Sequence, residues 1–331
     1  MSNLAKKLAG RVALVTGASR GVGRGAAIGL GEAGATVYVT ARTLNQAGAN
    51  PGTAEETAQA VTAAGGKGIA LQCDHLDDAQ VDAVFERIRR DHGGGLDILV
   101  NNVYPAPGIL PTMGPVMTGG KPFWESPVEQ GWETAFTIGV RGHYVATQKA
   151  MPMLLKRSGI VVNIASPGNY VYIMSTLYGM GRAAGERMTQ QMAMELAEYP
   201  VSVMMLWPGV VRTEVMGSAI EQNPEFIRET LRLVWTHIPG SKALFDRMST
   251  QELLSLLESP TFTGRAIAAL AADSKIKAKS GRVLSVPGVA KEYGFTDIDG
   301  RIPDGLGLLH EEVWPPLGAK GATAAGGVHH A

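Results

Sequence analysis

Thr16-Gly17-Ala18-Ser19-Arg20-Gly21-Val22-Gly23 is the stretch that decides the fold of this chain. The apolar residues before it predict a buried strand over residues 12–16, and the Ala- and Gly-rich residues after it predict a helix over 23–34. A glycine-rich turn between such elements lets the backbone approach a ligand, while the free N–H groups of the helix start point at an anion. We therefore expect a phosphate cradle made by Gly17, Ser19, Arg20, Gly21, Val22 and Gly23.

Apolar runs alternate with helical patterns along the rest of the chain. Further strands are predicted at 36–40, 68–73, 96–101, 160–165, 201–207 and 283–286, and further helices at 54–64, 77–91, 131–157 and 175–199. Strands joined by helices imply a parallel sheet that is covered on both faces. The pattern predicts one α/β domain over 8–290, a Rossmann-type doubly wound sheet of about seven strands in three α/β/α layers. Residues 291–331 would form an extension whose last part is mobile.

Composition restricts the classes of protein to which the chain can belong. Hydrophobic residues make up 45% of the 331 residues, which excludes the disordered class. The 30 basic and 30 acidic residues balance, so neither nucleic acid nor an anionic membrane is expected as a partner. The single cysteine, Cys73, fits a reducing compartment. Since no signal peptide, membrane span or metal-site pattern is evident, we expect a cytoplasmic protein that acts on a small molecule and holds no metal.

Two segments, residues 104–127 and 212–260, interrupt the alternation after the carboxyl end of a strand. Ligands bind at that edge of open α/β sheets, and long loops in compact domains are usually functional. We favour a role as substrate covers, and their apolar side chains favour a bulky apolar substrate; the alternative is that both are ordinary surface connections. The side chains concerned are Met113, Met117, Phe123, Trp124, Met216, Phe226, Leu231, Val234, Trp235 and Ile238.

The residues after the second predicted strand indicate which nucleotide the phosphate cradle would take. NAD-binding versions of this turn place an acid there for the ribose hydroxyls, whereas this chain has Arg42. Arg42 and Arg20 offer two guanidinium groups for a 2′-phosphate, so NADP is favoured over NAD; alternatively, Arg42 only ends the strand at the surface. Asp74 is placed to meet the adenine edge, unless it caps the following helix, a role that Asp77 serves equally well.

Ser166, Tyr178 and Arg182 have the spacing of a carbonyl-reducing site. A free tyrosine titrates near pH ~10, and a nearby cation lowers that pKa, so the phenol becomes a better acid and base near neutrality. Arg182 lies one helical turn beyond Tyr178, on the same face of the helix. Ser166 would bond the substrate oxygen, although a lone serine after a strand can also be a helix cap.

These motifs together resemble the classical short-chain dehydrogenase/reductase family over roughly residues 8–290. The resemblance rests on the glycine turn, on Ser166 and Tyr178, and on the motifs at 101–102 and 208–213. The stretches 123–125, 140–144, 165–168, 206–209 and 293–301 are similar to its dehydrogenase/reductase member 1 branch. The resemblance implies NADPH-dependent ketone reduction with Ser166, Tyr178 and Arg182 as catalytic residues. It also implies that Asn101, Pro208, Gly209, Val211 and Thr213 join Tyr178 and Arg182 around the cofactor.

The chain departs from the family pattern at two catalytic positions. Arg182 stands where the family has lysine, and it keeps the charge but does not readily release a proton. Gly139 stands where the family has an asparagine that holds a water in the proton path; His143, nearby, is a weak candidate to replace it. Residues 102–104 also read Asn-Val-Tyr where the family usually has Asn-Ala-Gly.

The departures leave more than one function open. The favoured prediction is an oxidoreductase that interconverts a carbonyl and a secondary alcohol with NADP(H), Tyr178 being the general acid and base. The alternatives are a catalytically impaired NADP(H)-binding sensor or scaffold, and a non-redox lyase or isomerase. In the family the helices that match 131–157 and 175–199 build an oligomer interface, which implies a homodimer or homotetramer.

Overall fold

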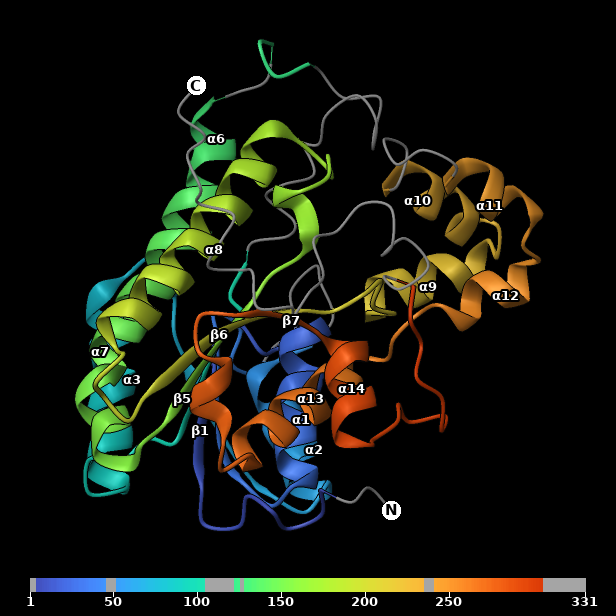
Figure 1. Ribbon diagram of the computed structural model, residues 1–331. Helices are drawn as coiled ribbons and strands as arrows, with labels where there is room; N and C mark the ends of the chain where they lie inside the picture. Colours follow the sequence, from blue (N-terminus) through green and yellow to red (C-terminus); the bar gives the residue numbers. More distant parts are fainter. Residues whose placement is uncertain (1–3, 46–51, 105–121, 126–127, 235–240, 306–331) are drawn as a thin grey trace.

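The centre of the molecule is a parallel sheet (Figure 1). The computed structural model describes residues 4–45, 52–104, 122–125, 128–234 and 241–305, and within these ranges seven strands pair in the order β3-β2-β1-β4-β5-β6-β7. The strands are β1 (Val12–Val15), β2 (Thr36–Ala41), β3 (Lys67–Gln72), β4 (Ile98–Asn101), β5 (Ile160–Ile164), β6 (Ser202–Trp207) and β7 (Val283–Ser285). The doubly wound α/β prediction is thereby confirmed.

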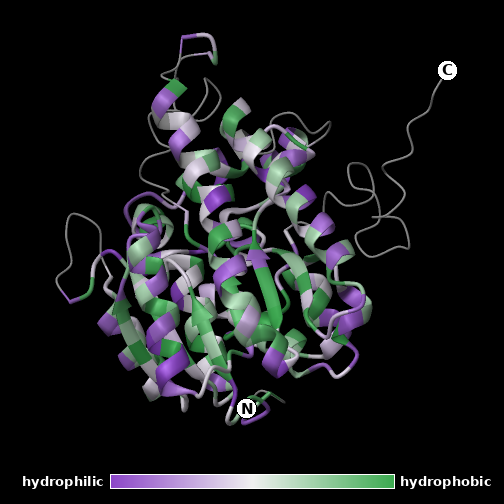
Figure 2. Cartoon of the chain, turned by 90° about the vertical axis from the view of Figure 1, so that its left-hand side faces the viewer, coloured by the Kyte–Doolittle hydropathy of each residue, from purple (hydrophilic) through white to green (hydrophobic). Residues whose placement is uncertain are grey.

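Helices cover both faces of the sheet because successive strand residues point to opposite sides. In β1, Ala13 and Val15 pack toward α1 (Gly21–Glu32), α2 (Ala54–Ala63), α13 (Pro260–Ala272) and α14 (Val286–Tyr293). Val12 and Leu14 pack toward α3 (Asp78–Asp91), α7 (Gly142–Arg157) and the end of α8 (Thr176–Glu195). The strands are mostly green in Figure 2, whereas the purple, hydrophilic stretches lie mainly on the helices around them.

The strand order places a switch point beside β1, which is where open α/β sheets bind ligands. After β3 the chain crosses over to pair β4 with β1, with Val15 opposite Val100. On the other side of β1, the Ala18 amide donates to the Thr40 carbonyl at 2.9 Å. The turn after β1 is therefore fixed between the carboxyl ends of β2 and β4.

The range 131–157 is helical throughout, as predicted, but its hydrogen-bond pattern changes along the chain. It consists of α6 (Val128–Trp132), a π-helix (η2, Glu133–Arg141) and α7, and the Gly142 amide donates to the Thr137 carbonyl five residues back. Thr137, Ile138, Gly139 and Val140 all have low helix propensity, so this part gives up α geometry most readily. Single π turns occur frequently at functional sites.

The segment predicted as a long substrate cover, residues 212–260, is largely helical. It contains α9 (Glu214–Gln222), α10 (Phe226–Val234), α11 (Ser241–Arg247) and α12 (Thr250–Ser255). Figure 1 shows these helices as a lobe at the upper right. Leu231 is buried in a core that also contains Trp207 of β6, and Met216 and Phe226 pack against it.

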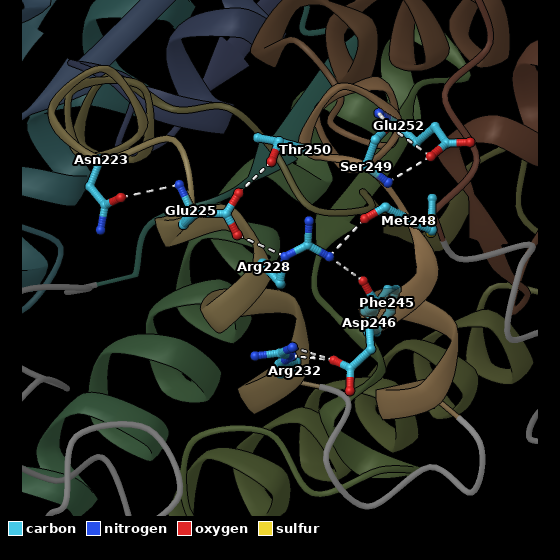
Figure 3. A network of polar contacts seen from close by, with 10 residues as sticks. All are labelled: Asn223, Glu225, Arg228, Arg232, Phe245, Asp246, Met248, Ser249, Thr250 and Glu252. Carbon is cyan, nitrogen blue, oxygen red and sulfur yellow. Dashed lines mark hydrogen bonds and ion pairs between the residues drawn. The ribbon is translucent and has the colours of Figure 1, made fainter.

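A polar network joins three helices of this lobe (Figure 3). Arg228 donates to Glu225 Oε2 at 2.8 Å, to the Met248 carbonyl at 2.8 Å and to the Phe245 carbonyl. Because Arg228 is mostly buried, these bonds fix α10 against α11 and the residues before α12. The lobe is thus a folded unit whose core continues onto β6, whatever its role toward a substrate.

The extension after α14 is fixed by specific contacts as far as it is described. Asp297 is buried and accepts the Ser259 amide at 2.7 Å, and Phe295 packs on Phe262 with ring centroids 5.6 Å apart. Arg301 donates to the Ser255 carbonyl at 3.0 Å. These contacts attach residues 295–301 to the end of α12 and the start of α13.

Some predictions lie outside the described residues. They concern Met113, Met117, Trp235, Ile238 and the mobile end of the extension, and the side chain of Val234 is not described either. Phe123 and Trp124 are described and are exposed, with their rings edge to face. Among the described helices, none combines the length and the apolar character needed to cross a membrane.

Candidate active site

The glycine turn after β1 is held by the residues after β4. Asn102 donates from Nδ2 to the Thr16 carbonyl at 3.0 Å and to the Gly17 carbonyl at 2.9 Å. Gly17 has φ +64°, and a Cβ there would lie 2.7 Å from Val103 Cα. A Cβ on Gly23 would lie 2.3 Å from Asn102 Nδ2. These two glycines therefore allow the turn to dock on residues 102–103, in addition to any ligand they admit.

The Gly21 amide at the start of α1 already binds an anionic group. It donates to Glu214 Oε2 at 2.8 Å, and Glu214 is the first residue of α9. The Glu214 carboxylate lies at the helix N-terminus where the sequence predicts a phosphate. It accepts the hydrogen bond that a phosphate oxygen would accept there. An anionic group therefore fits at this amide, which is the property that a phosphate site requires. Ser19 and Val22, in the same turn, are half-buried.

The two arginines predicted to select NADP lie at the same edge of the sheet. Arg20 is the N-cap residue of α1, and Arg42 directly follows β2 with an exposed side chain. The Ala18–Thr40 backbone bond brings the two chain segments together. Both guanidinium groups therefore belong to loops at the carboxyl end of the β1–β2 pair.

The turn after β3 shows whether Asp74 caps the following helix, the alternative to a role at the adenine edge. Asp77 is the N-cap of α3 and accepts the Ala79 amide at 2.9 Å, whereas Asp74 accepts the Leu76 amide at 3.1 Å in a tight turn. His75, for which the sequence suggests no partner, is buried and bonds Thr40 Oγ1 through Nε2 at 2.9 Å. Burial lowers the pKa of His75 to about 4, so it is neutral near pH 7.

The Ser166 and Tyr178 side chains meet as the spacing predicts. Ser166 Oγ lies 2.6 Å from Tyr178 Oη. Ser166 precedes a short 3-10 turn (η3, Pro167–Asn169) but makes no side-chain cap bond to it, so its hydroxyl is directed to Tyr178. A Cβ on Gly168 would lie 2.7 Å from the Tyr178 ring, so this glycine makes room for the ring.

Tyr178 lies in the first turn of α8. Ser175 is the N-cap of that helix and accepts the Tyr178 amide at 3.2 Å. Tyr178 is 6% exposed and packs against Ile173. The N-terminal end of a helix carries positive partial charge, so a negative charge that develops on the Tyr178 oxygen would be favoured there.

Arg182 lies against two aromatic rings. Its Cζ is 4.6 Å from the centroid of the Tyr178 ring and 4.2 Å from the centroid of the Tyr104 ring. The two rings are edge to face with centroids 5.9 Å apart. Such a geometry permits cation–π attraction with either ring. A serine, a tyrosine and a fixed cation thus form one cluster, an arrangement that can exchange a proton with the oxygen atom of a ligand.

The loop after β6 is fixed by a buried glutamate. Glu258 accepts the Gly209 amide at 2.8 Å, and its backbone pairs with the segment from Val210 to Arg212. Burial raises the pKa of Glu258 well above its ordinary value. Pro208 is buried, and Thr213 is the N-cap of α9, accepting the Met216 amide at 3.4 Å. A Cβ on Gly21 would touch Thr213, so this loop adjoins the glycine turn.

Comparisons with known proteins agree with this geometry. The family model for short chain dehydrogenase matches residues 11–224. The chain is 37% identical over 295 residues to dehydrogenase/reductase SDR family member 1 of Mus musculus, covering 88% of this chain and 84% of the mouse protein. The human protein of the same name is 35% identical over 307 residues, covering 92% and 89%.

The chain belongs to the short-chain dehydrogenase family. Its similarity to the member 1 proteins confirms the branch indicated by the sequence. Among solved structures, an actinorhodin polyketide ketoreductase variant crystallised with NADPH matches with a TM-score of 0.63 and 23% identity. That match covers 86% of this chain and 98% of the ketoreductase and shows the shared fold.

Asn101 of this short-chain dehydrogenase is part of the scaffold behind the cluster. Its side chain is fully buried and donates to Thr147 Oγ1 and to Asn163 Oδ1, both at 2.9 Å. These bonds join β4 to α7 and β5. Any contribution of the Asn101 side chain to cofactor binding would therefore be indirect.

A small cavity lies where the family has its catalytic asparagine. Gly139, His143 and Arg182 are among its lining residues. His143 Nε2 donates to the Val103 carbonyl at 3.1 Å, so in the neutral ring Nδ1 is left as the acceptor. Burial lowers the pKa of His143 to about 4, which makes it neutral near pH 7.

Sequence reasoning missed four residues of the site: Tyr104, Asn102 in its bracing role, Glu214 and Glu258. Asn102 belongs to the family motif at 101–102 and Tyr104 to the departure at 102–104. Glu214 directly follows Thr213. Their closeness in sequence to predicted site residues was therefore a signal for these three. Glu258 carried no local signal, because its contact with Gly209 spans 49 residues.

Proposed function

We propose that this chain is an NADP(H)-dependent oxidoreductase that interconverts a ketone and a secondary alcohol. The observation that carries the proposal is the 2.6 Å contact between Ser166 Oγ and Tyr178 Oη beside the Arg182 guanidinium. Membership of the short-chain dehydrogenase family and similarity to proteins named dehydrogenase/reductase support the same reaction class.

The cofactor would lie along the switch point of the sheet. The turn from Gly17 to Gly23 would hold the pyrophosphate, with the Gly21 amide released from Glu214. Arg20 and Arg42 would bind the 2′-phosphate, Asp74 the adenine, and the loop from Pro208 to Thr213 the nicotinamide end, with the Val211 backbone on the carboxamide. When bound, NADPH supplies the hydride for the reduction. The residues of this loop would hold its reactive end.

The side chains of Ser166, Tyr178 and Arg182 would transfer the proton to the substrate oxygen and stabilise the charges that result. Tyr178 donates its phenolic proton to the substrate oxygen as negative charge develops there. Ser166 Oγ, hydrogen-bonded to Tyr178 Oη, donates to the same oxygen and shares the stabilisation of the charge. The Arg182 guanidinium and the start of α8 then stabilise the phenolate that remains. The reverse order of proton transfers serves alcohol oxidation.

Apolar side chains near the carboxyl edge favour a bulky apolar ketone. Phe123 and Trp124 are exposed on the first cover segment, and the lobe from α9 to α12 brings Met216 and Phe226 near the end of β6. We infer that the cover segments 104–127 and 212–260 enclose such a substrate. The single cysteine, which is buried, suits a reducing cytoplasm as the location.

The second copy of the chain would pack on α7 and α8. Along the 20 residues of α8, only Tyr178, Glu186 and Thr189 are buried. Tyr144 of α7 and Met194 of α8 are 49% and 71% exposed. Covering such apolar side chains is the usual reason for an obligate interface. Sedimentation analysis of the intact chain and of Met194→Lys tests the homodimer or homotetramer.

One alternative is a protein that binds NADP(H) without turnover. Arg182 and Gly139 favour it, because both stand at catalytic positions where the chain departs from the family pattern. Incubation with NADPH and a panel of bulky apolar ketones decides between the two, provided that alcohols are identified by mass spectrometry. Alcohol formed in step with NADPH oxidation supports the reductase. Tight NADPH binding without alcohol supports the binding protein, and product formed without NADPH oxidation indicates a lyase or isomerase.

A further inference from the structure

Arg182 is held by aromatic faces and not by a carboxylate. Within the described ranges Arg182 interacts with Tyr178, to which it is hydrogen-bonded, and with Tyr104, not with an acidic side chain, and its buried Nε has no hydrogen-bond partner. Instead its Cζ lies 4.2 Å from the Tyr104 ring centroid and 4.6 Å from that of Tyr178. A carboxylate would neutralise the guanidinium, whereas aromatic rings hold it through their quadrupoles and leave its full charge.

Two hydrogen bonds of the preceding residue, Val103, hold the backbone next to Tyr104. The Val103 amide donates to Thr16 Oγ1 at 3.2 Å, and the Val103 carbonyl accepts from His143 Nε2 at 3.1 Å. The ring itself packs with Ile173 and Met174 around Tyr178. Because Tyr104 comes from the loop after β4 and Arg182 from α8, their contact ties the cation to the sheet.

Arg182 is the charged member of this group near neutral pH. The titratable side chains that face it are Tyr178 on its own helix, Tyr104 from the loop after β4 and His143 from α7. Burial raises the pKa of Tyr104 and lowers that of His143 to about 4, so neither of them carries charge. The location of the guanidinium therefore decides the electrostatic field at the Tyr178 oxygen.

We propose that Tyr104 is a positioning residue that stacks on the Arg182 guanidinium and so fixes the cation beside Tyr178. This inference rests on the proposed function, in which Tyr178 exchanges the proton. An arginine head is larger and reaches farther than an ammonium group, so it needs a surface that defines its plane. A lysine at 182 would need no such surface.

The test compares Tyr104→Leu with Tyr104→Phe in the native chain and in the Arg182→Lys background. Tyr104→Leu removes the ring, whereas Tyr104→Phe keeps it and serves as the matched control. With Arg182 present, Tyr104→Leu should lower kcat about tenfold, as expected for loss of a desolvated cation–π contact, with a smaller change in KM. Tyr104→Phe should stay within about threefold, and with Arg182→Lys the loss on Tyr104→Leu should shrink to about threefold or less.

A second readout does not need turnover. The NMR signal of isotopically labelled Tyr178, assigned by its loss in Tyr178→Phe, should titrate at higher pH in Tyr104→Leu than in the native chain, and Tyr104→Phe should leave it in place. Equal kcat losses for Tyr104→Leu in both backgrounds, or an unmoved Tyr178 titration, would overturn the proposal. If no variant reduces a ketone but the titration moves as expected, the positioning role stands and the proposed function fails.

Discussion

The backbone amide of Gly21 donates to the carboxylate of Glu214 at 2.8 Å, across 193 residues of sequence. The contact joins the N-terminal turns of α1 and α9, two places where positive partial charge gathers. A cofactor phosphate at Gly21 would have to displace this carboxylate. The first turn of α9 would therefore change its contacts if a nucleotide phosphate bound at Gly21.

Replacing Glu214 by glutamine should strengthen NADPH binding. The change removes a negative charge that competes with the pyrophosphate for the Gly21 amide, and we expect the Kd to fall by about three- to tenfold. Isothermal titration measures it, with Glu221→Gln on the same helix as the control. A Kd that rises, or that changes equally in the control, would show that the carboxylate does not compete.

Replacing Arg42 by alanine should reduce the preference for NADPH over NADH. The exposed guanidinium would lose its bond to the 2′-phosphate, which NADH lacks. The Kd for NADPH should rise by about ten- to thirtyfold while that for NADH stays within twofold, a difference of about 1.5–2 kcal/mol. Arg11→Ala, at another exposed arginine, is the control. An equal loss for both nucleotides argues against the NADP assignment.

Glu258 should make the folding stability decrease as the pH rises. Its pKa is raised in the folded state, so the folded chain keeps a proton that the unfolded chain releases near pH ~4.3. The favourable contribution is complete below that pH and is lost as pH rises toward the folded pKa. Glu258→Gln keeps an oxygen for the Gly209 amide and does not titrate. Urea unfolding at successive pH values should show the free energy of the native chain falling relative to the variant above pH ~4.3; a constant difference would contradict the buried neutral acid.

His143 should make the folding stability decrease as the pH falls. Its pKa is lowered to about 4, so the folded chain resists a proton that the unfolded chain takes up near pH ~6.5. Stability should therefore be complete above pH ~6.5 and fall by up to about 3 kcal/mol as pH drops toward 4. His143→Gln preserves a donor for the Val103 carbonyl and should make this fall shallower. Parallel unfolding curves for both proteins between these pH values would refute the assignment.

The fold was predictable because buried parallel strands form continuous apolar runs, and the strand limits differ from the predicted ones by one or two residues. Ser166 and Tyr178 were predictable as a pair because each is placed by a local element, a strand end and a helix start. The π-helix at 133–141 and the helices α9–α12 were not, because short helical segments depend on tertiary packing more than on propensity. The contacts of Glu214 and Tyr104 depend on how distant segments meet, so periodicity holds no signal for them.

Single-turnover oxidation of NADPH, followed by absorbance with a bulky apolar ketone, tests the central claim most directly. The native chain, Arg182→Lys and Tyr178→Phe are compared at saturating ketone, with NADPH binding measured for each. We expect oxidation by the native chain, faster oxidation by Arg182→Lys, and a loss of at least about a hundredfold in Tyr178→Phe with NADPH binding retained. Oxidation that survives in Tyr178→Phe at the native rate would contradict the role of Tyr178 and, with it, the proposed mechanism.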